Sequence, residues 1–184
     1  IVDDNQWIWD TRVPKFIPQI GSARAAELKN KRVLMIGTDM AAGKMTVGLE
    51  LYSYLIEKKI NTGFVATGQV GITVTGKGIP LDAYKLDHAC GAVETAVLEQ
   101  KEKEIVIVEG QGSILHPGST ATLPLMRGTC PTHMILCHIA RNDSLRSLEN
   151  IKIPDLKKFI ELNESLASVL GSYPKAKVIG VALN

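Results

Sequence analysis

The chain has 184 residues, 45% of them hydrophobic, and its 21 basic and 19 acidic residues leave a net charge of +2. This length and composition are typical of one α/β domain, and the near balance of charge gives no general case for binding nucleic acid or a membrane surface. No apolar run reaches transmembrane length, no signal peptide opens the chain, and the 3 cysteines form no C-x-x-C pair. These features favour a cytoplasmic protein with reduced thiols.

The chain begins at Ile1 and ends at Asn184, directly after a strand-like run. We expect residues 1–30, which show little periodicity, to be a connector from a missing preceding domain, with a short helix capped by Ser22. We expect residues 31–184 to be the α/β domain itself, truncated at its C-terminus.

An apolar run at residues 33–36 predicts a strand that is buried on both faces, and residues 47–58 predict an amphipathic helix. Between them the chain reads Gly37-Thr38-Asp39-Met40-Ala41-Ala42-Gly43-Lys44-Met45-Thr46. Strand, glycine-bounded turn, Gly-Lys and helix are the sequence form of a phosphate-binding loop, in which backbone N–H groups, the helix N-terminus and the lysine hold phosphates. We therefore predict phosphate binding here; a glycine-rich turn that binds nothing is the alternative.

The loop departs from the common pattern G-x-x-x-x-G-K-[ST]. Gly37 stands one place early, and Met45 takes the place of the usual hydroxyl residue, with Thr46 after it. The usual hydroxyl is a Mg²⁺ ligand, and one helical step turns a side chain by about 100°. The pattern thus supports phosphate binding more strongly than Mg²⁺ binding.

The second predicted strand, residues 64–67, is followed by four glycines within residues 68–78. This density predicts a loop with close backbone approaches. Ligands of α/β sheets bind beyond the carboxyl ends of the strands, so Gly68 and Gln69 are candidate contacts with a cofactor or substrate. A plain flexible loop is the alternative.

A long helix is predicted over residues 82–102, with a kink at Gly91. Asp87, Gly91 and Glu94 share one face of it, because they are four and three residues apart. Two interpretations stay open. The carboxylates face the site and bind an amine or act as a base, or they form a solvated acidic face.

The third predicted strand, residues 104–108, ends in Glu109-Gly110-Gln111-Gly112-Ser113. An acid directly after an apolar strand, downstream of a phosphate loop, occupies the position of the metal-binding or water-orienting acid of P-loop enzymes. The adjacent glycines let the chain approach a ligand closely. His116, in the loop that follows, is placed for proton transfer or anion binding, with a structural role as the alternative.

The remaining predicted elements are a short helix at residues 121–127, a strand at 132–137, a helix from Pro154 and a strand at 178–183. His138 and Arg141 follow the fourth strand and are candidate anion contacts. Alternating strands and helices predict a three-layer α/β domain of the P-loop NTPase type, with a mainly parallel sheet covered by helices on both faces. All the candidate loops then lie at the carboxyl edge of this sheet.

Two resemblances are carried by these motifs. Gly37-Thr38-Asp39 with Gly43-Lys44, Val108-Glu109-Gly110 and the terminal Asn184 resemble the dethiobiotin synthetase branch of P-loop proteins. That resemblance implies ATP as the ligand, with Lys44 on its phosphates and Asn184 on its purine. It also implies Mg²⁺ held by Asp39 and Glu109, and by Thr46 if a hydroxyl takes part.

The closer resemblance is to a family of D-glutamate N-acetyltransferase-like P-loop proteins, formerly uncharacterised. It is carried by Gly37-Thr38-Asp39 with Gly43-Lys44-Met45-Thr46, Phe64-Val65-Ala66-Thr67-Gly68-Gln69, Gly78-Ile79-Pro80-Leu81-Asp82-Ala83, Gly91-Ala92-Val93-Glu94, Val108-Glu109-Gly110-Gln111-Gly112-Ser113-Ile114-Leu115-His116-Pro117 and Leu136-Cys137-His138. Members of that family have the Lys-Met-Thr departure and a separate N-terminal α/β domain. The resemblance therefore implies one domain of a two-domain, homo-oligomeric protein with a small-molecule substrate.

The implied reaction is acetyl transfer from acetyl-CoA to the amine of a D-amino acid such as D-glutamate. The implied cofactor contacts are Gly37, Thr38, Asp39, Gly43, Lys44, Met45, Thr46, Gly68, Gln69, Gly110, Gln111 and Asn184. The implied proton acceptor is one of Glu109, Asp87, Glu94 and His116. Backbone N–H groups near residues 110–113 would stabilise the oxyanion, and His138 or Arg141 would pair with substrate carboxylates. An ATP–Mg²⁺-dependent carboxylate-activating enzyme and a non-catalytic nucleotide-binding regulatory domain are the alternatives.

Overall fold

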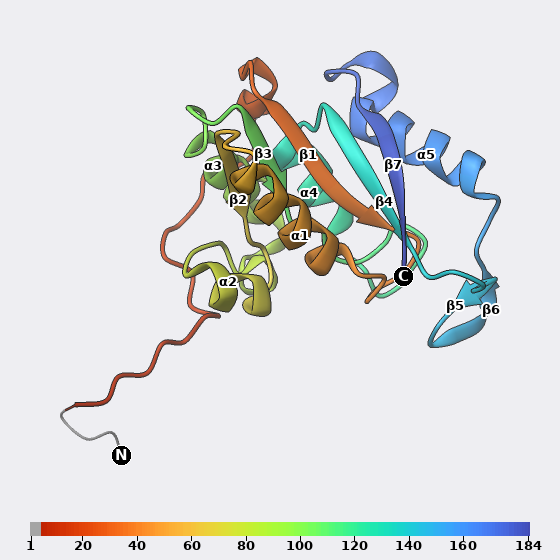
Figure 1. Cartoon of the computed structure of the whole chain (residues 1–184), viewed down its shortest axis with the longest axis horizontal. Coiled ribbons are helices and arrows are strands. Elements are labelled where there is room, and N and C mark those ends of the chain that lie inside the picture. The colour runs from red at the N-terminus through yellow and green to blue at the C-terminus, as the bar shows by residue number, and fades with distance from the viewer. Residues whose placement is uncertain (1–4) are drawn as a thin grey trace.

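Five strands form the central sheet of the computed structural model, which describes residues 5–184, so residues 1–4 of the predicted connector lie outside it. The strands are β1 (Lys31–Gly37), β2 (Thr62–Val65), β3 (Ile105–Val108), β4 (His133–His138) and β7 (Lys177–Leu183). They lie in the order β2-β3-β1-β4-β7, and each neighbouring pair is parallel (Figure 1). The predicted parallel sheet is confirmed, with β1 at its centre.

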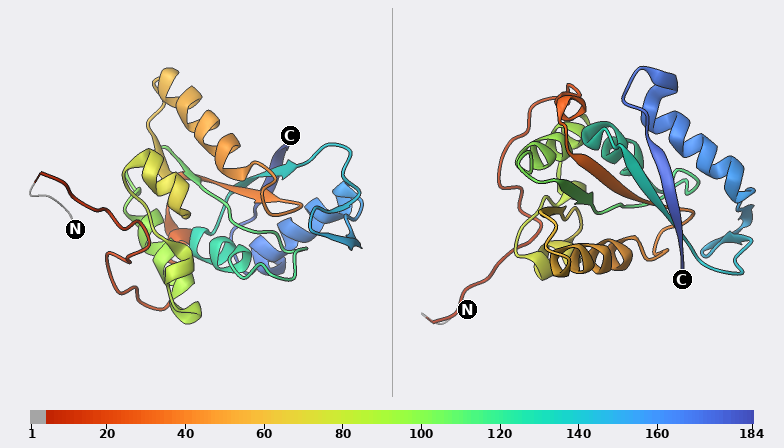
Figure 2. Two further views of the ribbon diagram at one scale, coloured as in Figure 1. Left: turned by 90° about the horizontal axis from the view of Figure 1, so that it is seen from below. Right: turned by 45° about the horizontal axis from the view of Figure 1, so that its top comes forward.

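Helices cover both faces of the sheet (Figure 2). One face carries α1 (Lys44–Glu57) and α2 (Gln69–Thr75), and the other carries α3 (Leu86–Leu98), α4 (Thr122–Thr129) and α5 (Leu156–Ser168). The short 3₁₀ turns are η1 (Arg24–Glu27), η2 (Leu81–Ala83) and η3 (Val169–Gly171). A separate antiparallel hairpin is formed by β5 (Ser144–Leu145) and β6 (Leu148–Lys152).

The alternation of side chains along β1 explains the three layers. Leu34 and Ile36 belong to the core shared with α3, α4 and α5, whereas Val33 and Met35 belong to the core on the α1 side. Successive side chains of a strand point to opposite faces, so a strand that is apolar at every position needs a cover on both. The prediction that this apolar run is buried on both faces of the sheet is confirmed.

The glycine-rich segment after β2 differs from the prediction. It is not a loop throughout, because α2 begins at Gln69, directly after Gly68. Gly71 and Ile72 are buried in this helix, and a Cβ atom on Gly71 would collide with the Glu109 carboxylate. The glycine is required by close packing, which a count of glycines cannot distinguish from flexibility.

Two further local predictions, a helix capped by Ser22 and a helix kinked at Gly91, are also wrong. Ser22 does not cap a helix, because η1 begins at Arg24 with Ala23 as its N-cap, and the Ser22 N–H donates to Glu94. The long helix is α3 alone, without a kink at Gly91. A Cβ atom on Gly91 would collide with the carbonyl oxygen of Gln19. A glycine at this position therefore lets the N-terminal segment pack against the helix.

The edge strand β7 is covered on one face only. Val178 packs on the core beneath α5. Ile179, Val181 and Leu183, which alternate along the other face, are 59%, 43% and 68% exposed. No helix within residues 5–184 has both the length and the apolar character needed to cross a membrane.

Candidate functional site

The loop between β1 and α1 has the geometry of an anion cradle. Ala41 and Gly43 adopt positive φ angles of 55° and 97°, and α1 begins at Lys44. The first hydrogen bond of the helix runs from the Val47 N–H to the Gly43 carbonyl at 2.9 Å. Between residues 41 and 46, no backbone N–H donates a hydrogen bond within the described chain. Unpaired N–H groups at a positive-φ turn and a helix N-terminus bind anions.

Lys44 lies inside this loop and is only 6% exposed. Its Nζ passes over Gly37, where a Cβ atom would be 2.9 Å away, and donates to the Asp39 carbonyl at 2.8 Å. Burial lowers the pKa of Lys44, and the nearby Cys137 and Asp39 partly oppose that shift. A buried ammonium group with unused hydrogen-bond donors is stabilised more by a bound anion than a solvent-exposed ammonium group is.

A cavity of about 390 Å³ lies over the loop, lined by residues 40–46, except Ala42, and by residues 110–112. These two segments follow β1 and β3, which are adjacent in the sheet. The chain leaves β1 toward β2 and leaves β3 toward β4, on opposite sides of this pair. Ligands of open α/β sheets bind at such a switch point.

Glu109 directly follows β3 and is 4% exposed. Its Oε2 accepts hydrogen bonds from the N–H groups of Thr67 at 2.7 Å and Gly68 at 3.1 Å. Its Oε1 accepts none from the residues that the structure describes. Burial raises the pKa of Glu109, and the two N–H donors partly oppose the rise. The carboxylate is therefore anchored by one oxygen and has the other available for a proton.

Asp39 is 3% exposed and both of its carboxylate oxygens are engaged. Oδ1 accepts from the Met40 N–H at 2.6 Å, and Oδ2 accepts from the Arg146 N–H, at the tip of the β5–β6 hairpin, at 2.8 Å. Thr46 is exposed on the first turn of α1. Within residues 5–184, no three His, Cys, Asp or Glu side chains gather into a possible metal site. Asp39 and Glu109 are thus not part of such a cluster.

The residues predicted to follow β4 and β7 also lie at this edge of the sheet. The Asn184 amide lies beside Gly43, with Nδ2 3.6 Å from where a Gly43 Cβ atom would be. His138 is 8% exposed, and its Nδ1 shares a 3.0 Å hydrogen bond with the hydroxyl of the buried Thr38. Arg141 is exposed in the next loop at a φ of 67°. Asn184 therefore lies beside the phosphate loop at Gly43, whereas His138 is buried beneath the loop and contacts Thr38.

A second cavity, of about 440 Å³, adjoins the first. Both are lined by Met40, Gln111 and Gly112. Asp82 of η2 also lines the second cavity, and its Oδ2 accepts a 2.8 Å hydrogen bond from the Gln69 side chain. Asp82 is not among the site residues expected from the sequence. The available signal was its place in residues 78–83, one of the segments that carry the family resemblance.

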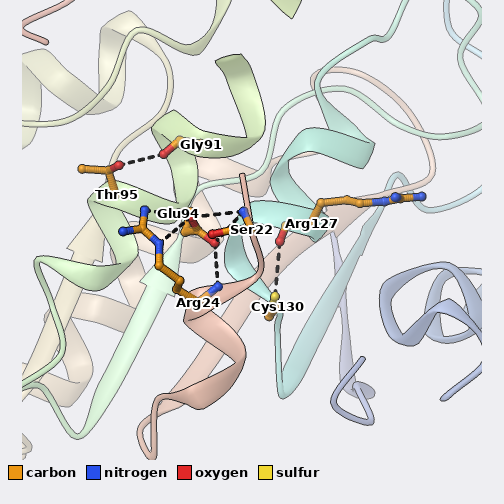
Figure 3. Close-up of polar contacts among 7 residues, drawn as sticks. All are labelled: Ser22, Arg24, Gly91, Glu94, Thr95, Arg127 and Cys130. Atoms are coloured by element: carbon orange, nitrogen blue, oxygen red, sulfur yellow. Dashed lines mark hydrogen bonds and ion pairs between the residues drawn. The ribbon is translucent and has the colours of Figure 1, made fainter. Parts of the chain in front are cut away.

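Three predicted catalytic residues are not brought to the phosphate loop. Glu94 is fully buried near the amino end of the strands, where its carboxylate pairs with Arg24 at 2.9 Å and accepts the N–H groups of Ser22 and Arg24 (Figure 3). Asp87 is exposed on the first turn of α3. His116 is half-buried, and its Nδ1 accepts the Gly118 N–H at 3.1 Å, so it shapes its own loop.

Comparison with known proteins agrees with this architecture. The model of a domain family described as a domain of unknown function, DUF1611_C, P-loop domain, matches residues 19–184. A protein of Pseudoalteromonas sp named D-glutamate N-acetyltransferase is 35% identical over 157 residues, which are 85% of this chain and 47% of that protein. A protein of Tritonibacter scottomollicae with the same name is 33% identical over 176 residues, which are 95% of this chain and 52% of that protein.

A solved structure is also similar. The crystal structure of a DUF1611 family protein from Anabaena variabilis is 43% identical and has a TM-score of 0.96, covering 99% of this chain and 53% of that one. The chain spans about half the length of the curated relatives it matches.

Proposed function

This chain belongs to the DUF1611 family of P-loop domains, and from that premise we propose that it binds the phosphates of acetyl-CoA for N-acetylation of a D-amino acid such as D-glutamate. The reaction is suggested by the names of two relatives that are 35% and 33% identical. One observation of the molecule carries the cofactor half of the proposal. Residues 41–46 present backbone N–H groups without an acceptor in the described chain, next to the buried Lys44.

These residues fit the anionic part of acetyl-CoA, which carries a pyrophosphate and a 3′-phosphate. The N–H groups of the loop and Lys44 would hold the phosphates. Asn184, beside Gly43, supports a contact with the purine. When bound, the cofactor supplies an acetyl group activated as a thioester.

We assign the role of base to Glu109, which directly precedes the residues 110–112 that line the loop cavity. The ammonium of an amino acid must lose a proton before its nitrogen can attack a carbonyl carbon. Oε2 of Glu109 is held by two N–H groups, while Oε1 stays available, and burial makes the carboxylate a stronger base by raising its pKa. The N–H groups of Gly110, Gln111 and Gly112 donate to no acceptor in the described chain, which supports a role in binding the carbonyl oxygen.

The engagement of Asp39 favours this cofactor over ATP with Mg²⁺. An ion held by Asp39 would have to share an oxygen with the Met40 or the Arg146 N–H. Phosphate capture by the loop and Lys44 involves no such sharing. We therefore derive no metal-dependent step.

Calorimetry with acetyl-CoA and with ATP–Mg²⁺, on the full-length protein, tests the proposal. We expect acetyl-CoA to bind and Lys44→Ala to weaken that binding at least about 10-fold, through loss of a charge-assisted contact. Lys29→Ala, which changes an exposed lysine before β1, is the matched control and should bind as the wild type does. Tight ATP–Mg²⁺ binding with no response to acetyl-CoA would overturn the proposal. Acetyl-CoA binding without acetylation of any amino acid tested would indicate a regulatory domain instead.

A further inference from the structure

The cavity of about 440 Å³ beside the phosphate-loop cavity is large enough for an amino acid. It is a separate compartment that meets the loop cavity at Met40, Gln111 and Gly112. We propose that this cavity is the acceptor subsite, that it takes a primary amine, and that Asp82 binds the ammonium group. The proposal rests on the proposed function, which puts the cofactor phosphates in the neighbouring cavity.

Asp82 sets the electrostatic character of this cavity. Asp82 is the one acidic residue among the described residues that line the cavity. Within residues 5–184, no Lys or Arg lines the cavity to balance its negative charge. Its Oδ2 is oriented by the Gln69 side chain at 2.8 Å, and its Oδ1 accepts no hydrogen bond from the described residues. A carboxylate with one oxygen fixed and one available can form a charge-assisted hydrogen bond with an ammonium, and because Asp82 is exposed in the ligand-free chain, this attraction gains strength when a ligand in the cavity displaces water. Gln69 is then a positioning residue for Asp82, not a cofactor contact.

The two adjoining cavities have opposite preferences. The loop cavity presents unpaired N–H groups and Lys44, which attract phosphates. The second cavity presents Asp82, which repels phosphates and attracts a cation. This contrast argues against a second part of the nucleotide in the Asp82 cavity.

The other walls suit the rest of an amino acid. Leu81, Leu86 and Ala89 offer an apolar surface to a short carbon chain, and the lining also includes the hydroxyl residues Ser119 and Thr120. Hydroxyl groups can donate hydrogen bonds to a carboxylate, but they select for a negative charge less strongly than a Lys or Arg side chain does. The chemical class is therefore an amino acid recognised chiefly through its amine.

The arrangement places the amine next to the group it would attack. The shared lining at Gln111 and Gly112 is where a ligand in one cavity meets a ligand in the other. As the nitrogen forms its bond to the acetyl carbon, the carbon–sulfur bond of the thioester breaks. The ammonium loses two protons in total, one to a base and one to the departing thiolate. Asp82 holds the ammonium before this step and does not itself take part in the bond changes.

The test is Asp82→Asn, which removes the charge but keeps an oxygen that can accept from Gln69. In the full-length protein we expect the KM for D-glutamate to rise by about 10- to 100-fold, with the Kd for acetyl-CoA unchanged. Gln69→Ala should raise the same KM by a smaller factor and leave kcat nearly unchanged. Glu102→Gln, at an exposed carboxylate near the amino edge of the sheet, is the matched control.

A binding measurement without acetyl-CoA separates the subsite from the reaction. Glutarate has both carboxylates of D-glutamate and no amine. We expect D-glutamate to bind at least about 10-fold tighter than glutarate, measured by NMR titration, and Asp82→Asn to remove the preference. Equal binding of the two by the wild type, or weaker acetyl-CoA binding by Asp82→Asn, would overturn the amine subsite. An intact preference without acetyl transfer would overturn the proposed reaction and leave the subsite standing.

Discussion

Burial disfavours the charge of the two ionisable side chains that matter most at the phosphate loop. It lowers the pKa of Lys44 and raises the pKa of Glu109. Desolvation without a full counter-charge costs folding free energy. Perturbed pKa values of this kind cluster at functional sites, where proteins give up stability for activity.

Lys44→Met removes a buried cation and keeps a side chain of similar length. Because the folded-state pKa of Lys44 is lowered, its charged form costs stability at neutral pH, so we expect the ligand-free variant to melt no lower than the wild type. Binding of acetyl-CoA should weaken at least about 10-fold. Thermal denaturation and calorimetry measure the two effects. A fall in Tm of more than about 4 °C would show that Lys44 is needed for folding instead.

Glu109→Gln should separate activity from stability. The folded-state pKa of Glu109 is raised, so the stability it contributes is present below its unfolded pKa and is lost as pH rises through the folded pKa. At neutral pH the amide should therefore be tolerated, since its oxygen can still accept from Thr67 and Gly68. We expect kcat to fall at least about 100-fold without a lower Tm.

The pH profile of the wild type gives a second check on Glu109. A base must be ionised, so kcat should decline as pH falls through the pKa of Glu109, above the ordinary value of 4.5. An unchanged kcat for Glu109→Gln would assign the proton transfer to another group.

Among the elements, α3 has a role that its sequence did not reveal. The N-terminal segment runs along it, with Gln19 against Gly91 and the N–H groups of Ser22 and Arg24 on Glu94. Arg24 also pairs with Glu94 at 2.9 Å (Figure 3). The face that carries Gly91 and Glu94 is thus a packing surface.

Gly91→Ala tests this packing. The added methyl would collide with backbone atoms of Gln19, and overpacking of a core costs about 1–3 kcal/mol. We expect the free energy of unfolding, measured in urea, to fall by that amount. Gly180→Ala is the matched control, because a Cβ atom there meets nothing within 4 Å. Equal stability of the two variants would contradict the docking of the N-terminal segment.

The Arg24–Glu94 pair should respond unequally to loss of either partner. The Glu94 side chain is 0% exposed and the Arg24 side chain is 45% exposed. Glu94→Ala leaves two backbone N–H groups and a guanidinium without their acceptor, and we expect a cost of about 3 kcal/mol. Arg24→Ala leaves the two N–H donors on the carboxylate, so we expect about 1 kcal/mol, as for a partly exposed pair. Chemical denaturation of the two variants compares these costs.

For the whole molecule, the sheet order places the site. β1 lies at the centre, with its alternate side chains in two separate cores, and the loops after β1 and β3 meet at one cavity. A central strand that is hydrogen-bonded on both sides, next to a loop with unpaired N–H groups, allows a ligand to change hydrogen bonding in the loop alone.

Hydrogen exchange should report this division. On adding acetyl-CoA we expect slower exchange at residues 41–46 and 110–112, because their unpaired N–H groups gain acceptors. The amides of β1 should be well protected with or without ligand, since both neighbours are in place. Lys44→Met should lose most of the ligand-dependent protection. Protection spread evenly over the molecule would contradict local ordering.

The sequence by itself determined the features that depend on short stretches of chain. Apolar runs predicted the five strands of the sheet, of which β1 is buried on both faces, whereas β7 is apolar although one of its faces is exposed. Glycine spacing followed by Gly43-Lys44 predicted the loop, because the turn, the charge and the helix start are adjacent in sequence. Alternation of strands and helices then predicted the parallel, three-layer fold.

Only the tertiary structure decided which distant residues meet. Gly71 was predicted to lie in a loop with close backbone approaches and Gly91 at a kink, but both lie within helices, and they are glycines because Glu109 and Gln19 pack against them. Glu94 was grouped with the catalytic candidates by helical spacing, yet it binds Arg24, 70 residues away. Asp82 lies in residues 78–83, a segment that carried the family resemblance, but its proposed role followed only from the cavity it lines. Spacing along one helix or loop identifies neighbours within a few residues, whereas long-range partners depend on how the layers are packed.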